Sequence, residues 1–141
     1  MCPPQAHPFS ERRRLVLTNY MKFTLSQIRY LIWLYRLSAN GCGVKNTELA
    51  NALGFSKPSV HYMLKSLSEL GMVEQEAFGL AHLTEDGCSA ARKYTFCFAA
   101  IERTMTELCG NGAASENAIC GMLADMPHEA IRNLYDGASR Y

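Results

Sequence analysis

The region that most restricts the fold is a pair of short helices joined by a glycine turn. The run TELANAL predicts a helix over residues 47–53, and Gly54 ends it because glycine tolerates the left-handed backbone of such a turn. Ser56 is placed to cap a second helix with Pro58 in its first turn. Apolar residues then recur at helical spacing until Gly71. This arrangement predicts a helix-turn-helix, whose second helix can fit a DNA major groove.

A small core should hold the two helices together. Ala50 lies where they approach most closely, so a small side chain is expected there. Apolar side chains at helical spacing should fill the rest of this core: Leu49, Leu53, Phe55, Val60 and Leu64.

The flanking segments extend the motif to a winged helix. Upstream, helical spacing predicts a helix over residues 23–37, followed by a polar link, CGVKN. Downstream, two extended runs at 72–76 and 80–83 fold back around Phe78-Gly79 and would form the wing. Thr84 caps a long helix, and further helices are expected at 115–123 and 127–135. The order predicts a mainly α protein.

Composition excludes several classes of protein. With 48% hydrophobic and 19% charged residues, the chain should be neither disordered nor membrane-spanning. The segment MCPPQAHPF does not resemble a secretory signal, so we expect a cytoplasmic protein with reduced cysteines. Sequence signatures of phosphate-binding loops, zinc proteases and serine hydrolases are absent, which argues against an enzyme.

Short hydroxyl and long basic side chains gather on the outward face of the second helix. Such side chains reach base edges and phosphates. Ser56, Ser59 and His61 are the candidates for base contact, and Lys57 and Lys65 for phosphate contact. The full set of predicted DNA-binding residues is Ser56, Lys57, Pro58, Ser59, His61, Lys65 and Lys45.

Two segments limit or extend this prediction. The wing sequence AFGLAH has no Lys or Arg, so its own contact with phosphates should be poor. Arg12, Arg13 and Arg14 on the N-terminal arm offer additional positive charge.

A thiol switch at Cys88 or Cys97 is an alternative sensing mechanism, although buried, inert cysteine is the commoner outcome.

The segment KPSVHYMLKSLSELGMVEQEAFGLAHLTEDG resembles the metal-dependent repressors related to the diphtheria toxin repressor and the manganese transport regulator. The matching positions are Ser56, Pro58, Ser59-Val60, Met63-Leu64, Leu67, Gly71-Met72-Val73, and Leu83-Thr84 with Gly87. The resemblance implies a homodimeric repressor that binds a palindromic double-stranded operator. We therefore expect a winged helix-turn-helix DNA-binding domain at 20–84 and a helical dimerisation region at 85–141, preceded by a flexible arm at 1–19 that its proline-rich start indicates.

In that family, a divalent manganese or iron ion ties the first helix to the dimerisation region. The ligand positions of this chain depart from the family pattern. Phe23, Ser26 and Phe98 stand where the family has ligands, and only Glu102 and Cys120 keep ligand chemistry. Two such groups do not make a selective site. The alternative is a relative that keeps the fold, with Phe23 and Phe98 filling the former metal cavity.

Two other functions stay open. The segment TLSQIRYLIWLY faintly resembles regulators of the multiple-antibiotic-resistance type, although their wing is longer and basic. A winged helix can also serve as a protein-interaction module that does not bind DNA, and a wing without basic residues favours that function. Positive charge on the second helix favours DNA.

Overall fold

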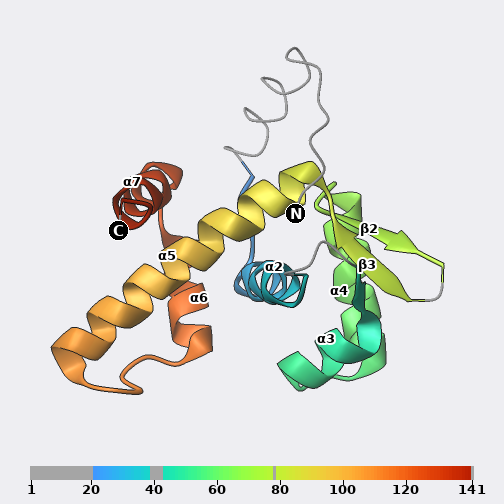
Figure 1. The fold of residues 1–141 in the computed structure, drawn as a ribbon, viewed down its shortest axis with the longest axis horizontal. Helices are drawn as coiled ribbons and strands as arrows, with labels where there is room; N and C mark the ends of the chain where they lie inside the picture. Colours follow the sequence, from blue (N-terminus) through green and yellow to red (C-terminus); the bar gives the residue numbers. More distant parts are fainter. Residues whose placement is uncertain (1–20, 39–42, 78, 141) are drawn as a thin grey trace, which may run out of the picture.

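A computed structural model describes residues 21–38, 43–77 and 79–140. Within these ranges the chain is mainly α-helical with one small sheet, as predicted (Figure 1). The elements follow one another in this order: α2 (Leu25–Leu37), β1 (Val44–Lys45), α3 (Asn46–Leu53), α4 (Lys57–Glu69), β2 (Val73–Glu76), β3 (Leu80–Leu83), α5 (Glu85–Cys109), α6 (Glu116–Asp125) and α7 (His128–Ala138).

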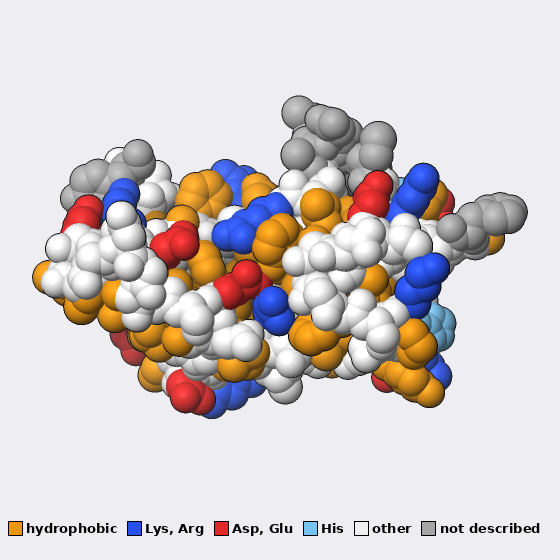
Figure 2. Space-filling model, turned by 90° about the horizontal axis from the view of Figure 1, so that it is seen from below, with side chains coloured by type: hydrophobic (Ala, Val, Ile, Leu, Met, Phe, Trp, Pro, Cys, Tyr) orange, Lys and Arg blue, Asp and Glu red, His pale blue; other side chains and the backbone are white. Residues whose placement is uncertain are grey.

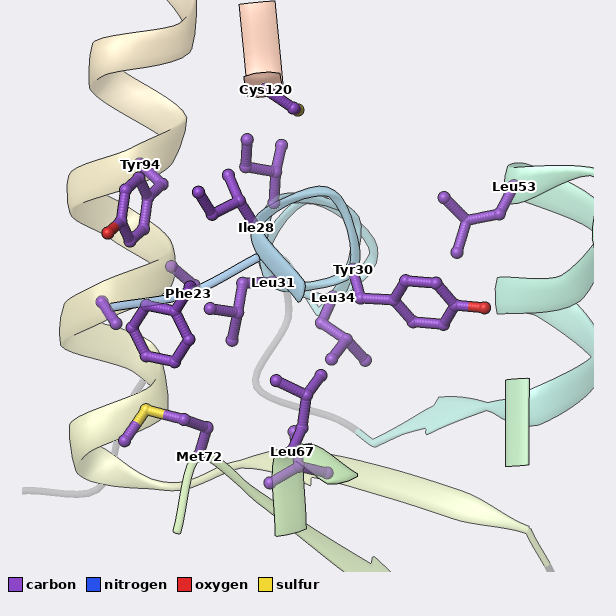
Figure 3. Close-up of a cluster of buried hydrophobic side chains, with 14 of the residues drawn as sticks. Phe23, Ile28, Tyr30, Leu31, Leu34, Leu53, Leu67, Met72, Tyr94 and Cys120 are labelled. Carbon is purple, nitrogen blue, oxygen red and sulfur yellow. The ribbon is translucent and has the colours of Figure 1, made fainter. Parts of the chain in front are cut away.

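Helix α2 lies at the centre of the molecule. Thr24 caps it, because the Gln27 backbone N–H donates to Thr24 Oγ1 at 3.2 Å and the Thr24 N–H donates to Gln27 Oε1 at 3.0 Å. Figure 3 shows its side chains pointing in several directions, with Ile28 toward α5 and α6 and Tyr30 toward Leu53 of α3. Buried residues therefore surround this helix on most sides, as expected of a helix that is apolar on more than one face.

One core runs through both predicted parts of the chain. Buried side chains from α3 and α4 join those of α5, α6 and α7 in a single cluster around α2. Phe23 and Phe98 are both buried in it, so they pack as core residues. The boundary between a domain at 20–84 and a region at 85–141 remains a prediction, and the arm at 1–19 lies outside the described residues.

The sheet has three antiparallel strands in the order β1-β3-β2. Strands β2 and β3 form the predicted hairpin, with Val73 opposite Leu83 and Glu76 opposite Leu80. Strand β1 was predicted to be part of a polar link, and this was wrong. Val44 is buried and pairs with Ala81, so two residues add a third strand to the wing.

A close backbone contact joins the wing to α5. The Gly87 N–H donates to Thr84 Oγ1 at 3.0 Å, and that hydroxyl donates to the Gly71 carbonyl at 2.6 Å. A Cβ atom on Gly87 would overlap the Met72 carbonyl group and would lie 2.7 Å from its carbon. The pairing of Thr84 with Gly87 therefore lets α5 begin directly against the end of α4 and the start of β2.

Helix α5 is buried only along its first half. Its buried residues run from Gly87 to Phe98, and no residue of α5 after Phe98 is buried. Figure 1 shows α5 crossing the molecule, with α3, α4 and the sheet near one end and α6 folding back toward α2 near the other. Helix α7 packs against α5 through Ile131, its buried residue.

Candidate nucleic-acid interface

The turn between α3 and α4 has the predicted geometry. Gly54 has φ +72°, and its N–H donates to the Ala50 carbonyl at 2.9 Å. The Phe55 N–H donates to the same carbonyl at 3.1 Å, which closes the turn. Ser56 then caps α4, because the Ser59 N–H donates to Ser56 Oγ at 3.3 Å. These contacts fix the direction in which the first turn of α4 leaves α3.

The outward face of α4 is open to solvent. All of the predicted DNA-binding residues are exposed: Lys45, Ser56, Lys57, Pro58, Ser59, His61 and Lys65. Within the described ranges, no carboxylate pairs with the ammonium group of Lys45, Lys57 or Lys65. The inward residues Val60, Leu64 and Leu67 are fully buried. Helix α4 therefore presents hydroxyl, imidazole and ammonium groups on a face that no described segment covers.

Tyr62 also belongs to this face, although sequence reasoning did not select it. Its side chain is 72% exposed, and its ring centroid lies 6.2 Å from that of His61. The spacing could have identified it, since Tyr62 follows His61 and precedes Lys65 on the same outward surface. An exposed phenol can donate a hydrogen bond to a phosphate or contact a thymine methyl group with its ring.

Phe55 does not fill the core between the helices, so that prediction was wrong. The residue is 43% exposed and stacks on Tyr30 of α2, with ring centroids 6.1 Å apart and planes at 10°. The Arg29 guanidinium carbon lies 5.2 Å from the centroid of the Phe55 ring. Tyr30 occupies the buried position instead, because it reaches from α2 toward α3 (Figure 3).

The wing and helix α4 carry charges of opposite sign. Exposed Glu74 and Glu76 give β2 negative charge, and His82 Nε2 lies 3.2 Å from Glu76 Oε1. Figure 2 shows Lys and Arg side chains scattered among acidic and apolar ones on the visible face, rather than gathered in a continuous band. Unpaired positive charge near the turn therefore comes from Lys57 and Lys65 of α4 and from Lys45 of β1, whereas strands β2 and β3 contain no Lys or Arg.

The described residues do not fit the divalent metal that the family resemblance implies. No three His, Cys, Asp or Glu side chains come together within them to hold a metal ion. Glu102 is exposed on α5, whereas Cys120 is buried on α6. Burial raises the pKa of the Cys120 thiol to about 11, and the nearby Glu116 charge acts in the same direction. A protonated thiol is a poor metal ligand.

The cysteines differ in accessibility. Cys97 is buried, and its burial raises the pKa of the thiol to about 11, so it lacks the lowered pKa of a redox switch. Cys109 is free and exposed at the end of α5. Cys88, in the first turn of α5, is half-buried.

Solved structures share this fold at low sequence identity. The hypothetical protein SSo2273 from Sulfolobus solfataricus has a TM-score of 0.57 at 20% identity, covering 84% of this chain and 92% of its own. The manganese regulator SloR has a TM-score of 0.59 at 21% identity over 78% of this chain, and IdeR from T. acidophilum has 0.52 at 18% over 79%. This chain spans 53% of each of those two regulator chains.

No curated protein matches the sequence. No described helix is both long and apolar enough to cross a membrane.

A family model described as the IclR helix-turn-helix domain matches residues 35–77, which extend from the end of α2 through α3 and α4 into the wing. Sequence comparison therefore does not confirm the metal-dependent repressor family. The match covers less than half of the chain, so it shows that residues 35–77 are similar to an IclR helix-turn-helix, and the described elements form a winged-helix fold around that segment.

Proposed function

We propose that the protein is a transcription regulator that binds a palindromic DNA operator as a homodimer, with repression as the direction that the family resemblance implies. A cytoplasmic location follows from this proposal. The observation that carries it is the face of α4, where exposed polar and basic side chains stand on a helix whose opposite side is fully buried. A helix held in this way can be inserted into a major groove without losing its packing.

The side chains on this face divide into two roles. Ser56, Ser59 and His61 lie around the first turns of α4, where short donors and acceptors can reach base edges. Lys57 and Lys65 supply the charges for phosphate contact, and Lys45 supplies another from β1. Tyr62 adds an exposed ring beside His61. Pro58 contributes by fixing the first turn of the helix rather than by charge.

Three observations support pairing of two copies through α5, α6 and α7. The second half of α5 contains no buried residue in the isolated chain, which is unusual for an amphipathic helix in a finished core. Leu108 near its end is 76% exposed, and Met122 on α6 is 38% exposed. A second copy that covered these side chains would bury apolar surface and place two α4 helices on one DNA duplex, about one helical turn apart.

Selection from a randomised duplex library tests this function even though the operator sequence is unknown. We expect the wild-type protein to enrich an inverted repeat. Fluorescence anisotropy with the enriched duplex should then show affinity that falls steeply between about 50 and 200 mM salt, because bound phosphates release counterions. Recovery of no preferred sequence, together with no binding to mixed-sequence duplex at low salt, would refute the proposal.

A protein-interaction module is the second candidate, and one observation favours it. The wing carries Glu74 and Glu76 on its outward strand, and negative charge there repels phosphates. The same anisotropy measurement separates the candidates. A module that does not bind DNA would leave the duplex free at both salt concentrations. Variants of Lys57 or Lys65 would then give the same anisotropy as the wild type.

A further inference from the structure

A single carboxylate joins α6 to α2. Glu116 is the first residue of α6, and its Oε1 atom accepts from Arg29 Nε and from Trp33 Nε1, each at 2.7 Å. The side chains of Arg29 and Glu116 are only 19% and 29% exposed. Charge-assisted hydrogen bonds at this distance are stronger than neutral ones, and partial burial protects them from screening by salt.

The same arginine contacts the turn that leads into α4. Its guanidinium carbon lies 5.2 Å from the ring centroid of Phe55, within the range of a cation–π contact. Phe55 in turn stacks on Tyr30 of α2 and directly precedes Ser56, the N-cap of α4. A continuous set of contacts therefore runs from Glu116 through Arg29 and Phe55 to the first residue of the α4 face.

A second contact between α2 and α4 lies further along α4. The Gln27 side-chain amide donates to Ser66 Oγ at 3.3 Å. This contact holds the later turns of α4 on α2 and involves no charge. The orientation of the first turn depends instead on Phe55, and the direction of the Arg29 guanidinium depends on the carboxylate that it meets.

We propose that Glu116 is a positioning residue for DNA binding: through Arg29 and Phe55, it holds the start of α4 in the orientation that enters the groove. This inference rests on the proposed function and deepens it, since it names the contact through which the C-terminal helices act on the DNA-binding face. The family resemblance implies a metal ion between the first helix and this region. Here an Arg–Glu–Trp contact joins α2 to α6, so operator affinity should depend on Glu116 and not on added metal.

The test compares two carboxylates in the first turns of neighbouring helices. Glu116→Gln removes the charge that orients Arg29 but keeps a side-chain oxygen for the Trp33 N–H. Glu129→Gln is the matched control, because Glu129 is an exposed first-turn residue of α7 with no described partner. Affinity for the duplex enriched by the wild-type protein is measured by anisotropy. We expect E116Q to bind at least about fivefold more weakly, the lower end of typical coupling between sites, and E129Q to bind like wild type.

A thermodynamic cycle distinguishes positioning from a general loss of stability. If Glu116 acts through Arg29, then R29Q and the double variant R29Q/E116Q should bind equally weakly, because the second change removes nothing further. Melting temperature and far-UV circular dichroism report whether each variant stays folded, whereas the emission of Trp33 would respond directly to the change at Glu116. Additive losses in the double variant, or E116Q binding like wild type, would overturn the inference while leaving DNA binding intact.

Two further measurements separate the inference from the proposed function. Manganese chloride or EDTA should leave the affinity of the wild type for DNA unchanged. A gain in that affinity of about tenfold or more with manganese would show that metal binding is coupled to DNA binding, and would overturn the inference. If the wild type binds no DNA, the proposed function fails, but the contact is still testable. Amide ¹H–¹⁵N shifts of Phe55 to Ser59 should then move in E116Q and not in E129Q, and unchanged shifts would refute the coupling.

Discussion

Gly87→Ala tests the contact that joins the wing to α5. Alanine normally stabilises a helix relative to glycine, by about 1 kcal/mol. At this position its Cβ would overlap the Met72 carbonyl group and would lie 2.7 Å from the carbonyl carbon. Both atoms belong to the backbone, so no flexible side chain can move aside. The start of α5 would have to shift away from β2, which strains the Thr84 hydrogen bonds to Gly71 and Gly87.

Forcing extra atoms into packed regions typically costs about 1–3 kcal/mol, and a clash with backbone belongs at the upper end. After the helical preference for alanine is subtracted, we expect a net loss of about 2 kcal/mol, equivalent to a melting temperature roughly 4–8 °C lower for a protein of this size. Circular dichroism melting measures this change. Gly137→Ala is the control, since a Cβ there meets nothing within 4 Å. Equal melting of G87A and wild type would refute the close contact.

Three further outcomes follow from the site and the cysteines. Lys65→Ala should weaken binding to all duplexes similarly and reduce the slope of log affinity against log salt by about one, whereas a change of preferred sequence would show that Lys65 contacts bases. In native protein, iodoacetamide should modify exposed Cys109 well before buried Cys97 and Cys120, and peptide mass spectrometry would detect the reverse order. Because burial raises the pKa of the Cys97 and Cys120 thiols from 9.0 to about 11, their contribution to stability is complete below pH 9 and is lost as pH rises toward 11. Urea unfolding at pH 8 and at pH 10.5 measures this loss, and equal stability at both values would contradict it.

Local signals predicted the helix-turn-helix closely. Ser56 and Thr84 cap the helices that follow them, as predicted, because a hydroxyl just before a helix accepts a hydrogen bond from a free backbone N–H of its first turn. Gly54 ends α3 with a positive φ for an equally local reason. Such short-range features are encoded within a few residues, so they can be predicted from sequence.

Features that depend on distant contacts were missed. Strand β1 has only two residues, and nothing near Val44 indicates its pairing with Ala81 on the wing. Phe55 looks like a core residue by spacing, but Tyr30, 25 positions earlier, takes the buried place and leaves the phenylalanine stacked above it. Hydrophobicity alone does not decide which of two aromatic residues is covered.

The contact of Arg29 with Glu116 spans 87 positions and has no local signature. A glutamate after Ser115 reads as an ordinary first-turn residue that favours the helix N-terminus. Only the packing of α6 against α2 gives it two donors. The seven predicted DNA-binding residues are exposed as required, but their individual contacts with bases and phosphates remain predictions.

The most direct measurement is the change in backbone amide ¹H–¹⁵N shifts when wild-type protein binds the library-selected duplex. We expect the largest changes in the stretch from Ser56 to Lys65, with smaller changes in the wing and none in α7. Shift changes confined to the C-terminal helices, with the amides of α4 unmoved at saturating duplex, would contradict entry of α4 into the groove.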